Sequence, residues 1–129
     1  NAAFWYVEDH GIATEESIDT QEKLKNVHTT AHNRSLEIRI AEVPANRTKA
    51  LESAVYKQPV SISVEASFQF YKSGVFSGKC GLVLDHGIVL TGYGNLNGKD
   101  YWKAKNSWGA TWGMQGYILI AKSNQDGPG

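Results

Sequence analysis

Apolar residues near the start of the chain recur at the spacing of a helix. Phe4, Trp5 and Val7 lie in this stretch, which ends at His10–Gly11. Apolar side chains three to four residues apart share one face of a helix, and a glycine often follows the last helical residue. The pattern predicts a short helix over residues 2–9.

Two later segments alternate between apolar and polar residues. Residues 15–35 are polar and show no sustained period, which predicts a loop. Alternation then follows in residues 36–40 and again in residues 60–66, so each segment predicts a half-buried strand. The alternating apolar positions are Leu36, Ile38, Ile40, Val60, Ile62, Val64 and Ala66.

A helix is expected between these two strands. Pro44 interrupts the first strand, and Asn46 is a residue type that commonly caps the N-terminus of a helix. Apolar and small residues at helical spacing continue through residues 48–55. Pro59 ends the helix, because proline lacks the backbone N–H that a helix needs.

The last part of the chain predicts three more strands. Apolar and aromatic runs occupy residues 88–90, 101–104 and 116–120. Asn97–Gly98 separates the first two runs and is a strong signal for a tight hairpin turn. Glycines predict a loop around Cys80. The C-terminal two thirds of the chain is therefore expected to be mostly antiparallel β-structure with one helix.

Composition narrows the class of protein without selecting a function. The 129 residues suit one domain, and 41% hydrophobic with 20% charged residues is ordinary for a globular protein. Thirteen basic residues balance thirteen acidic ones without a long basic block, so we expect no nucleic-acid partner. No apolar run approaches the roughly 20 residues that span a bilayer, so we expect no membrane partner. Without repeats or linkers, the prediction is a single domain over residues 1–129.

The single cysteine, Cys80, excludes a disulfide within the chain. Two N-glycosylation sequons, at Asn33 and Asn46, make these asparagines candidate glycosylation sites and are compatible with a secretory route. The chain begins at Asn1 rather than Met and shows no signal peptide, so we expect a processed or incomplete product.

Two segments carry candidate chemistry. His86 lies at the start of a predicted strand, and Asn106-Ser107-Trp108-Gly109 follows later in the chain. An imidazolium beside a thiol lowers the thiol pKa and supplies the thiolate that thiol proteolysis needs. An amide can orient that imidazole by accepting a ring N–H, and an aromatic ring over the hydrogen bond keeps water away. These residue types therefore suit one half of a thiol-protease site.

These segments resemble the papain-like cysteine peptidases. The likeness covers nearly the whole chain, least closely residues 17–35, and includes Lys57-Gln58-Pro59-Val60-Ser61, Cys80–Gly81 and Gly92-Tyr93-Gly94. The resemblance implies an α+β fold. The expected structure is the antiparallel, β-barrel-like right-hand domain of the papain fold with short flanking helices, lacking most of the N-terminal helical domain.

The resemblance also implies a role for each candidate residue. His86 would be the general base and later the general acid, Asn106 would orient it, and Trp108 would shield the pair. Further residues would line the substrate groove and leave a roomy, apolar pocket. They are Ser63, Asp85 and Gly87.

The sequence departs from the family in its cysteines. The family's nucleophile lies in a Cys-Gly-Ser-Cys-Trp-like segment, preceded by a glutamine of the oxyanion hole, and neither occurs here. The resemblance implies a structural disulfide for Cys80, whose expected partner is also missing. Cys80 is then an orphaned structural thiol, with a substitute nucleophile as the alternative.

Metal and cofactor binding are not expected. His28 and His32 are four residues apart, which would suit a metal site on a helix. No helix is predicted there and no cysteine lies nearby, so solvated loop positions are the preferred interpretation.

Three functions remain open. The first is the C-terminal, His/Asn-bearing portion of a papain-like cysteine endopeptidase, inactive alone, that acts on a peptide or protein substrate together with the missing N-terminal half. The second is a non-catalytic papain-fold protein, such as a protease inhibitor that docks on a proteinase, a storage protein or a peptide-binding protein. The third is a degradation product.

An uncovered apolar face near His86 and Trp108 predicts self-association or a partner. The family implies a secreted, vacuolar or lysosomal location.

Overall fold

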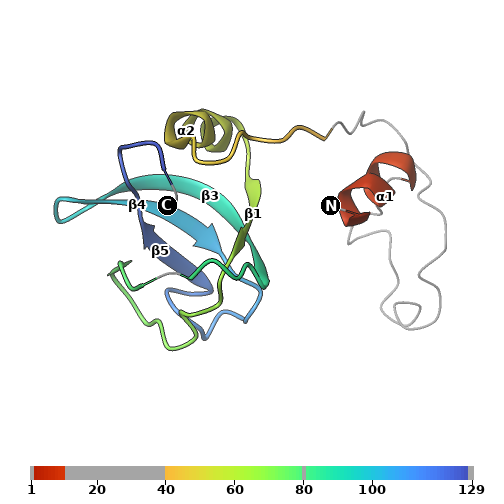
Figure 1. Cartoon of the computed structure of the whole chain (residues 1–129). Coiled ribbons are helices and arrows are strands. Elements are labelled where there is room, and N and C mark those ends of the chain that lie inside the picture. Colours follow the sequence, from red (N-terminus) through yellow and green to blue (C-terminus); the bar gives the residue numbers. More distant parts are fainter. Residues whose placement is uncertain (1, 11–39, 80, 128–129) are drawn as a thin grey trace. The chain divides into compact units, whose positions relative to one another are not determined.

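The structure, a computed structural model, describes residues 2–10, 40–79 and 81–127. The chain divides into two compact units, residues 1–42 and 43–129 (Figure 1).

In the first unit, helix α1 (Ala2–His10) confirms the predicted N-terminal helix. Its three aromatic side chains are each about half exposed: Phe4, Trp5 and Tyr6. The predicted loop at residues 15–35 lies outside the described residues. So does the predicted strand at residues 36–40, except for Ile40, which is not in a strand.

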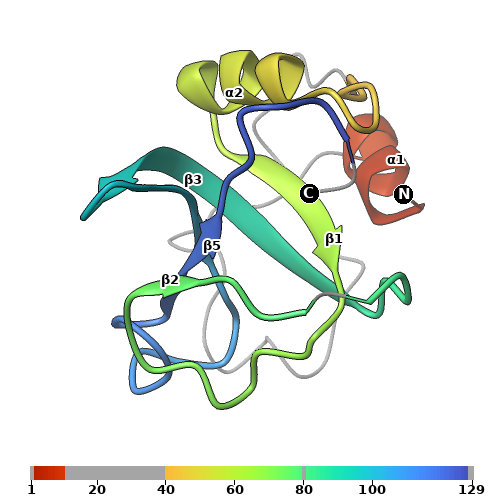
Figure 2. The ribbon, with the colours of Figure 1, turned by 60° about the vertical axis from the view of Figure 1, so that its left-hand side comes forward.

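A five-stranded sheet in the order β1-β3-β4-β5-β2 forms the second unit (Figures 1 and 2). Neighbouring strands are antiparallel except β2, which runs parallel to β5. The α+β class is therefore confirmed, with a mixed sheet that stays open between the edge strands β1 and β2 instead of closing into a barrel. The strands are β1 (Val60–Val64), β2 (Val75–Phe76), β3 (His86–Leu96), β4 (Lys99–Lys105) and β5 (Tyr117–Ala121).

The predicted hairpin at Asn97–Gly98 joins β3 to β4. Asn97 has φ 52° and Gly98 has φ 81°, and Leu96 pairs with Lys99 across the turn. Positive φ at both central residues is the requirement of a tight type I′ turn, which asparagine and glycine satisfy with little strain. The turn therefore sets the register of this strand pair from Leu96 to Gly92, and an irregularity between Leu90 and Gly92 shifts the register beyond that point.

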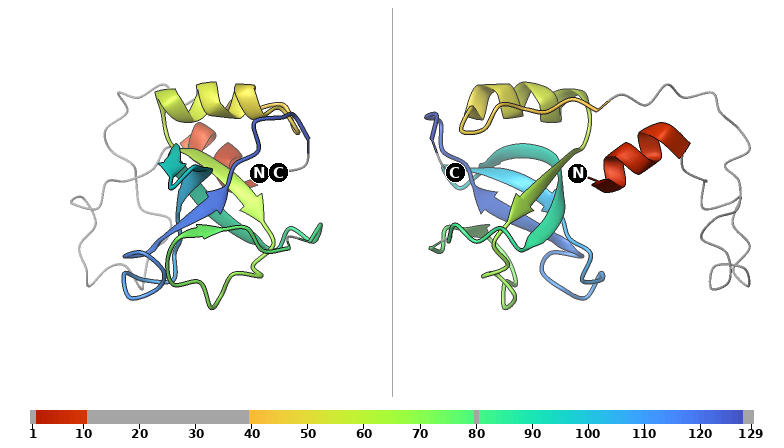
Figure 3. Two further views of the ribbon diagram at one scale, coloured as in Figure 1. Left: turned by 90° about the vertical axis from the view of Figure 1, so that its left-hand side faces the viewer. Right: turned by 45° about the vertical axis from the view of Figure 1, so that its right-hand side comes forward.

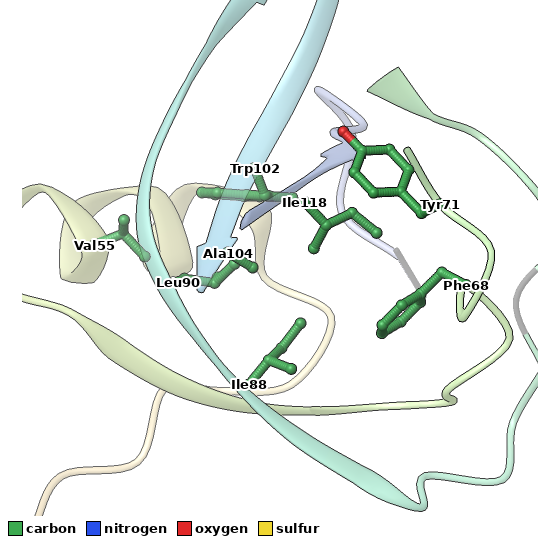
Figure 4. Packing of buried hydrophobic residues seen from close by; sticks show 8 residues of the cluster. All are labelled: Val55, Phe68, Tyr71, Ile88, Leu90, Trp102, Ala104 and Ile118. Atoms are coloured by element: carbon green, nitrogen blue, oxygen red, sulfur yellow. The ribbon is translucent and has the colours of Figure 1, made fainter. Parts of the chain in front are cut away.

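The hydrophobic core lies on one face of this sheet. Leu90 of β3 and Ile118 of β5 are the largest side chains that are fully buried. Figure 4 shows Val55, Phe68 and Tyr71 pointing toward the side chains of β3, β4 and β5. The remaining members of the cluster are Ile88, Trp102 and Ala104.

Helix α2 (Thr48–Lys57) packs against the sheet and ends before Pro59, as predicted. The prediction of Asn46 as its N-cap is wrong. Asn46 has φ 59°, and Arg47 is the N-cap residue, but its side chain makes no capping hydrogen bond to the helix backbone. The N–H of Thr48 instead donates to Asp126 Oδ1 at 2.9 Å. Asp126, which lies 78 residues later in the sequence, thus takes the place of a local cap residue.

Two other boundaries differ from prediction. Strand β1 ends at Val64 and not at Ala66, because the Ala66 N–H turns to donate to Asp85 Oδ1 at 2.9 Å. The two-residue strand β2 lies where a glycine-rich loop was expected, and it is too short to show alternation. In the described part of the chain, no helix has the length and apolar character to cross a membrane.

A polar cluster joins the β3–β4 hairpin to the C-terminal segment. The carboxylate of Asp100 accepts hydrogen bonds from Asn95 Nδ2 and Asn124 Nδ2, both at 2.7 Å. These bonds hold the pKa of Asp100 below its ordinary value of 3.8. Lys122 Nζ donates to Asn124 Oδ1 and lies 5.4 Å from the ring centroid of Trp102. The cluster therefore stabilises the fold while Asp100 is ionised.

We expect the change Leu90→Ala to reduce the free energy of unfolding by about 2–5 kcal/mol, because it leaves a cavity where Leu90 is only 1% exposed. Urea unfolding followed by tryptophan fluorescence measures this. Leu96→Ala, at the more exposed hairpin end, is the matched control. Equal losses for both variants would contradict the assigned core.

We expect the change Asp100→Asn to destabilise the fold at about pH 6 and to have much less effect near pH 2. A carboxyl whose pKa is lowered in the folded state contributes stability above its unfolded pKa, and this contribution disappears as the pH falls through the folded pKa. Urea midpoints at both pH values measure it, with the exposed Asp9→Asn as control. If the urea midpoints of Asp100→Asn and the unsubstituted chain differed by the same amount at both pH values, the prediction would be contradicted.

Candidate active site

The sheet brings His86 and Asn106 together. His86 is the first residue of β3, Asn106 directly follows β4, and the antiparallel pairing places both at the same end of the sheet. The ring nitrogen Nε2 of His86 lies 2.8 Å from Asn106 Oδ1. Asn106 is 6% exposed, and its backbone N–H donates to the Gly116 carbonyl at 2.9 Å. The acceptor is therefore held in place by its own backbone.

The contacts of Asn106 determine which ring nitrogen of neutral His86 carries the hydrogen. Asn106 Oδ1 also accepts the backbone N–H of Ser107 at 2.8 Å. A backbone N–H can only donate, so this atom is the amide oxygen, and Nε2 of His86 must carry the hydrogen in their shared bond. The neutral ring then has its lone pair on Nδ1, which has no hydrogen-bond partner among the described residues. Nδ1 is thus free to accept a proton.

Aromatic rings pack against His86. The ring of Trp108 stacks on His86 with centroids 5.0 Å apart and planes 24° apart. Trp112 meets Trp108 edge-on at 5.1 Å, and its Nε1 donates to the Gln69 carbonyl. The ring centroids of Phe68 and Trp108 are 5.7 Å apart. Sequence reasoning missed Phe68 as a residue of the site, because nothing local links the loop after β1 to His86.

The amide nitrogen of Asn106 is less well satisfied. Among the described residues, Nδ2 is buried without a hydrogen-bond partner. A buried donor in this state destabilises a protein by about 1–3 kcal/mol. Asn106 is therefore placed in a way that serves the His86 contact better than it serves stability.

The three predicted groove residues lie beside His86. Ser63 of β1 pairs with Gly87 of β3, adjacent to the pair formed by Val64 and His86. Ser63 and Gly87 are exposed, and a Cβ on Gly87 would meet nothing within 4 Å. Asp85 is exposed but has a structural contact, because its carboxylate accepts the Ala66 N–H. The surface at Gly87 is therefore open, and the substrate-groove role of these three residues stays a prediction.

A run of exposed apolar residues leads into this site. The side chains of Leu82, Val83 and Leu84 are 90%, 70% and 64% exposed, immediately before Asp85 and His86. Sequence analysis did not single them out, although three consecutive apolar residues in a loop are a visible signal. Together with Trp108, which is 37% exposed, they leave apolar surface near His86 uncovered.

Other candidates lie elsewhere or outside the described residues. Cys80, Asn33, His28 and His32 are not described, so their predicted roles stay predictions. Asn46 is exposed before α2, away from the core. Within residues 2–10, 40–79 and 81–127, no group of three or more His, Cys, Asp or Glu side chains is arranged to hold a metal ion.

Comparison with known proteins gives one family. The family described as Papain family cysteine protease matches residues 1–127. The thiol protease SEN102 of Hemerocallis sp. is 43% identical over 131 residues, covering 96% of this chain and 36% of that protein. The oryzain beta chain of Oryza sativa subsp. japonica is 54% identical over 85 residues, covering 64% of this chain and 18% of that protein. The chain thus spans about a third or less of the length of these curated relatives.

Solved structures of cysteine proteases also superpose on this chain. The proform of the ragweed pollen allergen Amb a 11, a cysteine protease, superposes with a TM-score of 0.75 at 38% identity, covering 95% of this chain and 36% of the allergen chain. The bromelain protease of Ananas comosus, solved with the E64 inhibitor, superposes with a TM-score of 0.61 at 49% identity. That match covers 65% of this chain and 40% of the bromelain chain.

We expect NMR spectra of neutral His86 to show the tautomer protonated at Nε2, because Asn106 Oδ1 accepts that hydrogen. In Asn106→Ala the acceptor is lost, and both tautomers should be populated. Nitrogen-15 shifts of the ring, recorded at a pH high enough to deprotonate it, measure this. Asn124→Ala, remote from His86, is the control. A ring protonated at Nδ1 in the unmodified chain would be the contrary result.

Proposed function

Because the chain belongs to the papain family of cysteine proteases, we propose that it carries the histidine and asparagine of a thiol-protease active site. The observation that supports this most directly is the 2.8 Å contact between His86 Nε2 and Asn106 Oδ1, with the ring of Trp108 stacked on His86. Two side chains 20 residues apart form it, together with an aromatic cover, in the arrangement that the chemistry requires.

In this proposal His86 is the general base. Its Nδ1 lone pair accepts the proton of a cysteine thiol and leaves a thiolate beside an imidazolium. The thiolate attacks the scissile carbonyl, and the imidazolium then returns its proton to the departing amine. Asn106 keeps the ring oriented throughout and, as an amide, adds no charge of its own. Trp108 limits water access to their hydrogen bond.

We further propose that the chain is inactive alone. Its one cysteine, Cys80, lies outside any Cys-Gly-Ser-Cys-Trp-like segment, so the reactive thiol must come from a segment that this sequence does not contain. The relatives are much longer than the matched region, since the chain covers 36% of the Hemerocallis thiol protease. A complementary papain-family segment is the partner that would also cover the exposed apolar residues before His86.

The substrate in this proposal is a peptide or protein. The open space at Ser63 and Gly87 would accept a large apolar side chain next to the scissile bond. The bromelain structure holds the E64 inhibitor, which makes E64 a suitable ligand to test on the complemented protein. The chemistry needs only protein groups and no cofactor. The sequons and the family support a secreted, vacuolar or lysosomal location.

We expect the purified chain alone to hydrolyse no peptide substrate. When it is co-expressed with the part of the Hemerocallis thiol protease that it does not match, we expect the complex to hydrolyse peptides. In that complex, His86→Ala should lower kcat by about 10²–10⁴-fold, because proton transfer is lost. Thr91→Ala, an exposed change on the same strand, is the matched control. Fluorogenic peptide hydrolysis, with E64 as inhibitor, is the measurement.

Two results would contradict the proposal. Hydrolysis by the chain alone that disappears in Cys80→Ser would show that Cys80 is the nucleophile. Full activity of the His86→Ala complex would remove His86 from catalysis. Inhibition of papain or trypsin by the folded chain would instead support the non-catalytic binding alternative.

A further inference from the structure

The sequon at Asn46 lies on the surface of the second unit. Asn46 is exposed in the turn before α2, with φ 59°. Its side chain has no hydrogen-bond partner in the described part of the chain. Its backbone carbonyl accepts the Gly127 N–H at 3.2 Å. A group attached to Nδ2 would therefore meet neither the core nor the sheet.

Residues 125–127 form hydrogen bonds with each of the three residues of this sequon. The hydroxyl of Thr48 donates to the Gln125 carbonyl at 2.8 Å, and its N–H donates to Asp126 Oδ1 at 2.9 Å. Arg47 pairs with the same Asp126 carboxylate at 3.1 Å. These three contacts join residues 77 to 79 positions apart in the sequence. In the left view of Figure 3 the segment after β5 reaches the start of α2.

These contacts restrict when the sequon is accessible. The threonine hydroxyl is the part of an Asn-X-Thr sequon that defines it as an acceptor. In the folded chain that hydroxyl is already bound to Gln125. During synthesis, by contrast, Thr48 emerges long before Gln125 and has no such partner. The sequon is thus open in the nascent chain and closed in the folded one.

We propose that Asn46 carries an N-linked glycan that is attached before residues 125–127 dock against it. Nδ2 of Asn46 attacks the anomeric carbon of a lipid-linked oligosaccharyl diphosphate. The N–C bond forms as the bond from that carbon to the diphosphate oxygen breaks, the diphosphate leaves, and a base of the transferase takes one Nδ2 proton. The proposal rests on the secretory location proposed above and not on the catalytic role of His86.

The first test isolates Asn46 by removing the other sequon. Asn33→Gln and the double variant Asn33→Gln/Asn46→Gln are secreted from yeast, with the complementary segment as above, and treated with peptide-N-glycosidase. We expect the enzyme to remove one glycan from the single variant, seen as a gel shift and by intact mass, and none from the double variant. Absence of a glycan on the single variant overturns the proposal. Peptide hydrolysis by the same samples reports separately on the catalytic role.

The second test addresses timing. Unglycosylated Asn33→Gln, either folded or unfolded in urea and then diluted, is mixed with microsomal transferase and its lipid-linked donor. We expect the unfolded chain to be modified at least tenfold more than the folded one. The double variant Asn33→Gln/Thr48→Ala should not be modified in either state. Equal modification of folded and unfolded chains overturns the claim that docking closes the sequon.

Discussion

The antiparallel pairing of β3 with β4 is the constraint on which the site depends. The turn at Asn97–Gly98 sets the register near the hairpin, and an irregularity between Leu90 and Gly92 shifts it by one residue. The pairs of Leu90 with Ala104 and of Val89 with Lys105 then place His86 and Asn106 at the same end of the sheet. In a β-strand a shift of one residue moves every side chain to the opposite face. The burial of Leu90 in the same strand therefore opposes any slip that would carry His86 away from Asn106.

The side-chain amide of Asn106 has one well-satisfied atom and one unsatisfied atom. Its side-chain oxygen accepts two N–H groups, from His86 and from the Ser107 backbone, so its orientation is fixed. Its Nδ2 is buried without a partner in the described part of the structure, which is unfavourable. An apolar residue would remove that penalty and a carboxylate would add charge beside the imidazole. The amide is the choice that orients the ring while leaving the net charge of the pair unchanged.

Features set by neighbouring residues could be predicted from the sequence, whereas features set by distant residues could not. Asn97–Gly98 specifies its turn locally, and alternation in residues 60–66 predicted β1, which ends two residues earlier at Val64. The cap of α2 comes from Asp126, 78 residues away, so the local candidate Asn46 was misleading. Phe68 joins the aromatic rings packed against His86 only through tertiary packing. Two-residue β2 forms because β5 is there to pair with it.

The tautomer of His86 has a geometric consequence for any protein that completes this site. With Nε2 committed to Asn106 and one ring face stacked on Trp108, the remaining lone pair lies in the ring plane at Nδ1. An incoming sulfur atom must arrive along that single direction, within hydrogen-bonding reach of Nδ1. Under the proposed function, His86 thereby constrains the direction from which the thiol of a complementary segment approaches, which gives a geometric criterion for designing such a segment.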